Sequence, residues 1–306
     1  MNRRKTLCLL WLLLICAAAA LGEPACAAES YTENQFGFVD AVMDSMGGIP
    51  DDAEGRLARI RDVGVLRVAT EPYFAPQEFI DPTQSGQAAY VGSDMEMARL
   101  IAERMGVKLE IVPMNFSRVL TSLALGECDL AISALAFTPG RATQCTLSNG
   151  YYFSEETAGS GLLIRTEDRE KIRSLEDLAG LDLVAQRTSL QEGILAEQVI
   201  DYRQFRRVST VQEVYLMLQR GKADAAVVDI DTARAYIDST PGCGLTLVEG
   251  CLFRTDEAYN GDRVAARKGE TQLIAFVNDV IRELTESGQY MKWYRDAALY
   301  ASWLGL

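Results

Sequence analysis

An arginine at the start of a predicted helix is the first residue of this chain that suggests chemistry. Thr138 is a good helix N-cap and Pro139 a good first helical residue, so Arg141 lies in the first turn. The helix dipole makes that end positive and disfavours a cation. A bound carboxylate would balance the charge, because guanidinium and free helix N–H groups both donate to it. A salt bridge from Arg141 to Glu155 or Glu156 explains the residue equally well on this stretch alone.

Two further strand ends carry polar side chains. Thr188 and Ser189 follow one predicted strand, and Asp229 ends another. Ligand sites in α/β sheets lie outside the carboxyl ends of the strands. An arginine for a carboxylate and an aspartate for an ammonium together fit the head group of an amino acid. The structural alternative for Asp229 is to cap a helix at 232–237, which Asp231 could do equally well.

These residues are placed by an alternation of strands and helices that occurs twice along the chain. It predicts an α/β fold with two lobes in series, each built on a mainly parallel sheet. A loop at 70–82, which contains Glu71 and Phe74, is expected either to line a ligand or to cap the core. In the first half we expect helices at 33–46, 53–63 and 94–105, strands at 65–69 and 108–112, a helix from 115 and a strand from 129. In the second half we expect strands at 162–164, 183–186, 205–208 and 223–228, and helices at 174–179, 188–200, 211–220 and 273–284.

The N-terminus has the pattern of an export signal. Arg3, Arg4 and Lys5 precede an apolar run at 7–20 and an A-x-A cleavage pattern at 25–27. The run is too short to span a bilayer comfortably, so residues 1–27 are predicted to be a signal peptide that is removed. The protein is therefore expected in the periplasm or at the cell surface. A lipid anchor at Cys26 is the less favoured alternative.

Composition excludes several kinds of function. The formal net charge of −13 argues against nucleic acid as a partner. The chain contains no histidine, which excludes Ser-His-Asp and Cys-His catalysis and any zinc site with a histidine ligand. We expect no metal and no cofactor.

Four cysteines follow the predicted signal peptide. Export to an oxidising compartment favours two disulfides, and we predict the local pairs Cys128 with Cys145 and Cys243 with Cys251. A four-cysteine metal site is the alternative, but the spacing contains no C-x-x-C pair.

Taken together, these motifs resemble the type II periplasmic solute-binding proteins, specifically family 3, the amino-acid-binding components of ABC importers. The resemblance covers about Arg59 to Trp293. It rests on GVLRVAT at 64–70, YVGSDMEMA at 90–98, GECD at 126–129, IS at 132–133, TPGR at 138–141, SLEDLAG at 174–180 and GKAD at 221–224.

The family resemblance implies two α/β lobes joined by two crossing segments, near Ala158 and at 253–260. After residues 28–64, an N-terminal helical extension, it places lobe 1 at 65–158 and 255–306 and lobe 2 at 159–254. The lobes are expected to close on the ligand as a clamp. The chain is expected to be a monomer that delivers an amino acid to an ABC permease.

The resemblance also assigns roles to single residues. Arg141 corresponds to the arginine that binds the α-carboxylate, and Asp229 to the aspartate that binds the α-ammonium. The remaining ligand-binding positions are Ser133 at the head group, Thr188 and Ser189 at the helix start of lobe 2, Phe74 and Phe116 around the side chain, and Glu71 in the pocket.

The chain departs from the family pattern at three positions. Ala134 and Ala136 replace residues that often carry hydroxyl groups, and Arg187 replaces a usual glycine. Arg187 would favour an acidic ligand side chain if it reached the ligand, whereas Glu71 would favour a cationic or amide side chain. The sequence leaves this conflict open.

A binding protein that makes and breaks no bond is therefore the favoured function. The alternatives are a dehydratase of an aromatic-precursor acid on the same fold, with Glu71 as the general acid, and the ligand-sensing part of a receptor.

Overall fold

The computed structural model describes residues 55–153, 159–199, 201–253 and 260–306. The predicted signal peptide, the helix at 33–46, Cys26, the first crossing point at Ala158 and most of the second crossing segment lie outside these residues. No helix within the described ranges is long and apolar enough to cross a membrane.

The first sheet has the strand order β5-β1-β6-β13-β7. β1 is parallel to β5 and β6, whereas β13 is antiparallel to both β6 and β7, so the sheet is mixed. Its strands are β1 (Val65–Thr70), β5 (Lys108–Pro113), β6 (Leu130–Ala136), β7 (Cys145–Tyr152) and β13 (Asp262–Arg267). Its helices are α4 (Gly55–Val63), α5 (Ser93–Met105), α6 (Phe116–Ala124), α7 (Pro139–Gln144), α11 (Thr271–Glu286) and α12 (Gln289–Leu304).

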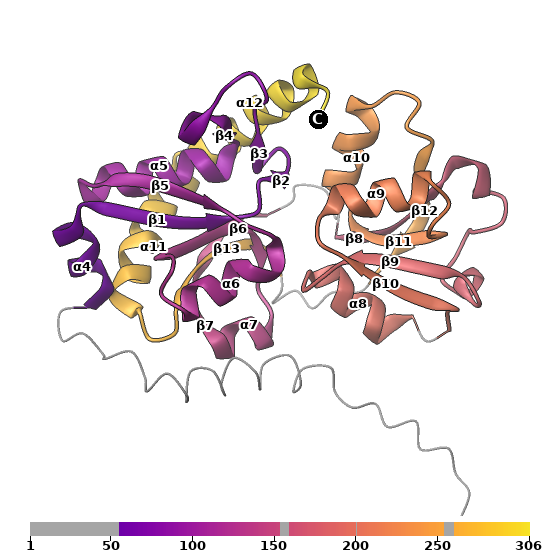
Figure 1. Ribbon diagram of the computed structural model, residues 1–306, viewed down its shortest axis with the longest axis horizontal. Helices are drawn as coiled ribbons and strands as arrows, with labels where there is room; N and C mark the ends of the chain where they lie inside the picture. The colour runs from indigo at the N-terminus through magenta and orange to yellow at the C-terminus, as the bar shows by residue number, and fades with distance from the viewer. Residues whose placement is uncertain (1–54, 154–158, 200, 254–259) are drawn as a thin grey trace, which may run out of the picture. The chain divides into compact units, whose positions relative to one another are not determined.

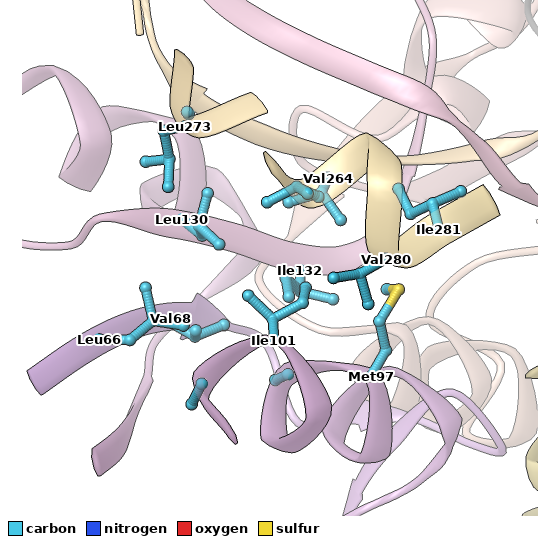
Figure 2. Packing of buried hydrophobic residues seen from close by; sticks show 14 of the residues in the cluster. Leu66, Val68, Met97, Ile101, Leu130, Ile132, Val264, Leu273, Val280 and Ile281 are labelled. Atoms are coloured by element: carbon cyan, nitrogen blue, oxygen red, sulfur yellow. The ribbon is translucent and has the colours of Figure 1, made fainter. Parts of the chain in front are cut away.

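Alternating side chains of these strands form a separate core on each face of the sheet. Figure 2 shows Leu66 and Val68 of β1, Leu130 and Ile132 of β6, and Val264 of β13 beside residues of α5 and α11. The intervening residues, such as Ala69 and Ala131, face a second cluster that includes residues of α6. A strand has a side-chain period of two, so helices on both faces require this nearly continuous apolar sequence.

The second sheet has the order β10-β9-β11-β8-β12. β10, β9 and β11 are parallel, and β8 runs antiparallel to β11 and β12. Its strands are β8 (Ser160–Arg165), β9 (Asp182–Gln186), β10 (Gln204–Val208), β11 (Ala225–Asp229) and β12 (Leu245–Leu252). Its helices are α8 (Leu190–Gln198), α9 (Val211–Gln219) and α10 (Ile230–Ser239), with short 3₁₀ turns at Thr166–Asp168 and Glu176–Leu178. Residues of α8 pack on one face of this sheet and residues of α9 and α10 on the other, and Figure 1 shows α8 and α9 on opposite sides of the strands.

The α/β fold with two successive sheets confirms the prediction, but each sheet has both parallel and antiparallel pairings instead of being mainly parallel. The short helix predicted at 174–179 is only a 3₁₀ turn, and the other predicted elements within the described ranges are present. The loop expected at 70–82 differs, because it contributes to a three-stranded sheet, β2 (Tyr73–Phe74), β3 (Glu78–Ile80) and β4 (Tyr90–Val91), with a 3₁₀ turn at Gly86–Ala89. Strands β12 and β13 and helix α12 were not predicted from periodicity.

Candidate functional site

Arg141 lies at the start of α7, as the sequence predicts. The Thr138 hydroxyl accepts a hydrogen bond from the Arg141 backbone N at 3.1 Å, which confirms the N-cap. The residue is only 7% exposed. Its guanidinium donates to the carbonyl oxygens of Ala136 (2.7 Å) and Thr188 (3.2 Å), and lies 5.5 Å from the centre of the Phe116 ring. Arg141 therefore reaches from the first sheet to the loop before α8.

The charge on Arg141 is retained despite this burial. Burial lowers the pKa of Arg141 to about 10, so the side chain stays cationic near neutral pH. Within the described part of the chain, Arg141 forms no ion pair with an acidic side chain. The alternative partners Glu155 and Glu156 lie outside the described residues. Arg141 is therefore a buried cation whose guanidinium donates to carbonyl oxygens.

The loop between β9 and α8 is held by capping interactions. Ser189 is the N-cap of α8, since its hydroxyl accepts from the Glu192 backbone N at 3.0 Å. The Glu192 carboxylate in turn accepts from the Thr188 backbone N, and Thr188 has a left-handed φ of 62°. The Thr188 hydroxyl donates to the carbonyl of Arg187, whose own side chain is exposed. These contacts present the Thr188 carbonyl to Arg141.

Asp229 ends β11 and caps α10. Its Oδ1 accepts from the Thr232 backbone N at 2.9 Å, which confirms the capping alternative and assigns it to Asp229 rather than Asp231. Burial, opposed by the Thr232 hydrogen bond, raises the Asp229 pKa to about 6. A capping role does not prevent a carboxylate from also contacting a ligand, because it has two oxygens.

Glu71 connects the loop after β1 to both sheets. Its Oε1 accepts from the Gln186 side-chain amide at 3.0 Å, and its backbone N donates to the Ser133 hydroxyl at 3.0 Å. Glu71 is 1% exposed, and this burial raises its pKa to about 8 although the Gln186 hydrogen bond opposes the shift. Gln186 was not predicted as a site residue, although its place at the end of β9 is a signal for it.

Two buried acidic residues near Ser133, Glu78 and Asp94, were not predicted from the sequence as part of the site. The Ser133 hydroxyl donates to Glu78, and Asp94 accepts from the hydroxyls of Tyr151 (2.8 Å) and Tyr290 (2.7 Å). Burial raises the pKa values of both Glu78 and Asp94, and the negative charge of Asp94 raises that of Glu78 further. The Ser133 hydroxyl is thus engaged within the protein, between Glu71 and Glu78.

The two predicted aromatic wall residues have different surroundings. Phe116 belongs to the α6 side of the first sheet and contacts Arg141. Phe74 packs against a hydrophobic cluster of the second sheet that includes Val211 and Tyr215. The structure therefore brings Arg141 together with Phe116 and Thr188, and Glu71 together with Ser133, whereas the two rings belong to separate clusters.

Neither predicted disulfide is formed in this structure. Cys128, Cys145, Cys243 and Cys251 are free thiols. Cys128 and Cys145 share one hydrophobic cluster, in which the Cys145 thiol contacts the Arg141 carbonyl at 3.0 Å. Over the described ranges, no group of histidine, cysteine, aspartate and glutamate side chains is arranged to hold a metal ion.

Most of the chain matches a known protein family. Residues 66–305 match the family described as bacterial extracellular solute-binding proteins, family 3. The arginine-binding extracellular protein ArtP of Bacillus subtilis is 28% identical, covering 66% of this chain and 75% of ArtP. The L-cystine-binding protein TcyJ of Escherichia coli is 27% identical, covering 79% and 86%.

A solved structure agrees with these sequence relatives. An amino acid ABC transporter substrate-binding protein from Streptococcus pneumoniae, bound to L-arginine, is 31% identical with a TM-score of 0.71, over 79% of this chain and 97% of that one. These relatives are binding proteins, which favours binding over the dehydratase alternative. The chain belongs to the bacterial extracellular solute-binding proteins of family 3.

Proposed function

We propose that the protein binds an amino acid outside the cytoplasm and delivers it to an ABC permease. The observation that carries this proposal is Arg141, a buried guanidinium on the first sheet whose recorded contacts are two carbonyl oxygens and an aromatic ring. A ligand α-carboxylate would replace these neutral carbonyl acceptors and form a bidentate, charge-assisted pair of hydrogen bonds with the guanidinium. Asp229, at the end of β11 in the second sheet, would bind the α-ammonium.

A cationic side chain is the ligand type that the buried charges favour. Glu71 is a buried carboxyl held by a hydrogen bond from Gln186, and burial is the main cause of its raised pKa. A cationic ligand group beside Glu71 would offset this burial and lower the pKa again. Arg187, the residue that would have favoured an acidic ligand, is exposed. Since two of the similar proteins bind arginine, we propose a basic amino acid and take L-arginine as the first probe.

The other predicted site residues receive more specific roles in this proposal. Ser133 would position the Glu71 backbone rather than donate to the ligand, because its hydroxyl is already engaged. Thr188 and Ser189 would shape the loop that faces Arg141. Phe116 and Phe74 would flank the ligand side chain.

We further propose that binding involves a hinge motion between lobe 1 (65–158 and 255–306) and lobe 2 (159–254). Hydrogen bonds that join the two parts include Arg141 to Thr188, Gln186 to Glu71, and Gln212 to the Tyr73 carbonyl at 2.5 Å. A ligand that touches both sheets would stabilise the closed arrangement by its differential affinity for it.

The proposal is tested by a thermal-shift screen of the mature protein against the common amino acids. A ligand at about 1,000 times its Kd stabilises the folded state by about 4 kcal/mol, which raises Tm by several degrees. We expect L-arginine to give such a shift, and Arg141→Ala to reduce the stabilisation by about 1.5–3 kcal/mol, the contribution of a charge-assisted pair. Arg282→Ala, which removes an exposed arginine paired with Asp279, is the control and should keep the shift. If no amino acid shifts Tm, the proposed function is wrong.

A further inference from the structure

Asp262, the first residue of β13, lies beside the end of β6, the strand that leads into α7 and Arg141. In the strand register it is opposite Ala136, the last residue of β6, and Tyr152, the last residue of β7. Because β13 runs antiparallel to β6, its first residue meets the end of β6, just before α7 and Arg141. A carboxylate therefore stands beside the position where Ala136 provides no hydroxyl group.

The Asp262 carboxylate is oriented by a buried donor. The side-chain amide of Gln77, itself only 3% exposed, donates to Asp262 Oδ2 at 2.8 Å and is 3.4 Å from the Tyr290 hydroxyl. No other hydrogen bond to this carboxylate, and no ion pair, is found among the residues that the structure describes. The residue is half-buried, and one of its two carboxylate oxygens is not engaged by Gln77.

Asp262 also shares its electrostatic surroundings with the predicted head-group residues. Burial, together with the negative charges of Asp94 and Asp229, raises its pKa to about 7, while the Gln77 hydrogen bond and the charge of Arg141 act in the opposite direction. Asp262 and Asp229 belong to different sheets, and the negative charge of Asp229 disfavours ionisation of Asp262. A cation between two such carboxylates would be attracted to both.

Building on the amino-acid-binding function proposed above, we propose that Asp262 is a further ligand-binding residue, which binds the α-ammonium of the ligand together with Asp229. Its negative charge makes the head-group site selective for a free amino group, because a ligand without one leaves two carboxylates facing each other.

The test is calorimetric titration of Asp262→Asn with two probes, L-arginine and 5-guanidinopentanoate, which is the same molecule without its α-amino group. Asparagine keeps an oxygen that can accept from Gln77, so the fold should be retained, and a melting curve checks this. We expect the affinity for L-arginine to fall at least tenfold and that for 5-guanidinopentanoate to stay the same or rise, because the variant removes one of the two facing carboxylates. The matched control is Asp279→Asn, an exposed aspartate on α11 that should leave both affinities unchanged.

Each contrary outcome has a definite meaning. Binding of L-arginine by Asp262→Asn within twofold of the wild type overturns the role of Asp262 alone. Equal weakening of both probes assigns Asp262 to support of the fold and also overturns that role. If the wild-type protein binds neither L-arginine nor any other amino acid, both the proposed function and this inference fail.

Discussion

Glu71 shows how a single buried residue links the site to the stability of the protein. Its carboxyl is almost inaccessible to solvent and accepts a hydrogen bond from the Gln186 side-chain amide. Burial raises its pKa to about 8, so the folded protein holds this proton over a range in which the unfolded chain, with an ordinary glutamate pKa of 4.5, has lost it. Glu71 therefore opposes folding once the pH exceeds its unfolded value.

We expect Glu71→Gln to change the pH dependence of stability. With a raised pKa, the stability contributed by the protonated carboxyl is fully present below pH 4.5, declines as pH rises, and levels off above about pH 8. In that window the wild type should lose about 1.4 kcal/mol per pH unit relative to the variant. Urea unfolding from about pH 5 to 9 measures this difference, with Glu110→Gln, an exposed carboxylate, as control. Parallel curves for wild type and Glu71→Gln would contradict the account.

Several site residues could be predicted from sequence because they act through local rules. Thr138, Ser189 and Asp229 cap helices, and capping depends only on side-chain type and a few neighbouring residues. The only local signal for Gln186 is its place at the end of a predicted strand, and Asp262 could not be identified by such rules. Their importance arises from partners 115 and 185 residues away in the chain, Glu71 and Gln77, which no local pattern encodes.

At the scale of elements, the loop that carries Gln77 depends on a glycine at the start of α5. Gly92 has φ 118° and ψ 166°, a conformation that is essentially restricted to glycine. A Cβ at this position would lie 2.2 Å from the Gln77 carbonyl oxygen and 2.9 Å from that of Pro76. These are backbone atoms that cannot move aside easily, so Gly92 allows the close contact between this loop and α5.

We expect Gly92→Ala to destabilise the protein by about 3 kcal/mol, since it combines a strained backbone with a steric clash. Gly193→Ala is a matched control that we expect to change the free energy of unfolding in the opposite direction. Gly193 lies inside α8, and a Cβ added there would have no neighbouring atom within 4 Å, so alanine should stabilise by about 0.5–1 kcal/mol. Urea denaturation distinguishes the two, and a neutral Gly92→Ala would refute the proposed role of the close contact.

Two of the elements that hydrophobic periodicity did not predict, β12 and α12, have weak hydrophobic patterns in their sequences. β12 includes the exposed Glu249 and Gly250, and its pairing with β8 shifts register before Leu252. In α12 only Tyr290 and Ala301 are buried, so the helix has no apolar stripe to recognise. By contrast, α11 buries a regular row of aliphatic residues, and the sequence predicts it.

At the scale of the whole molecule, we propose that a bound amino-acid ligand contacts both sheets through its α-carboxylate and α-ammonium groups. The order of strands and helices and their division into two lobes could be predicted from sequence because each unit is local, and the family resemblance supplied the crossing segments and the clamp-like closure. The interactions between the sheets, such as those of Arg141 with Thr188 and Gln186 with Glu71, depend on tertiary geometry and could not be predicted.

The most direct measurement is a titration cycle that pairs Arg141 with the ligand α-carboxylate. Wild type and Arg141→Ala are each titrated calorimetrically with L-arginine and with L-argininamide, in which a neutral amide replaces the carboxylate. A charge-assisted bidentate pair is worth about 1.5–3 kcal/mol, so the wild type should prefer L-arginine by roughly ten- to hundredfold. In Arg141→Ala this preference should fall below about threefold. An undiminished preference in the variant would contradict the account.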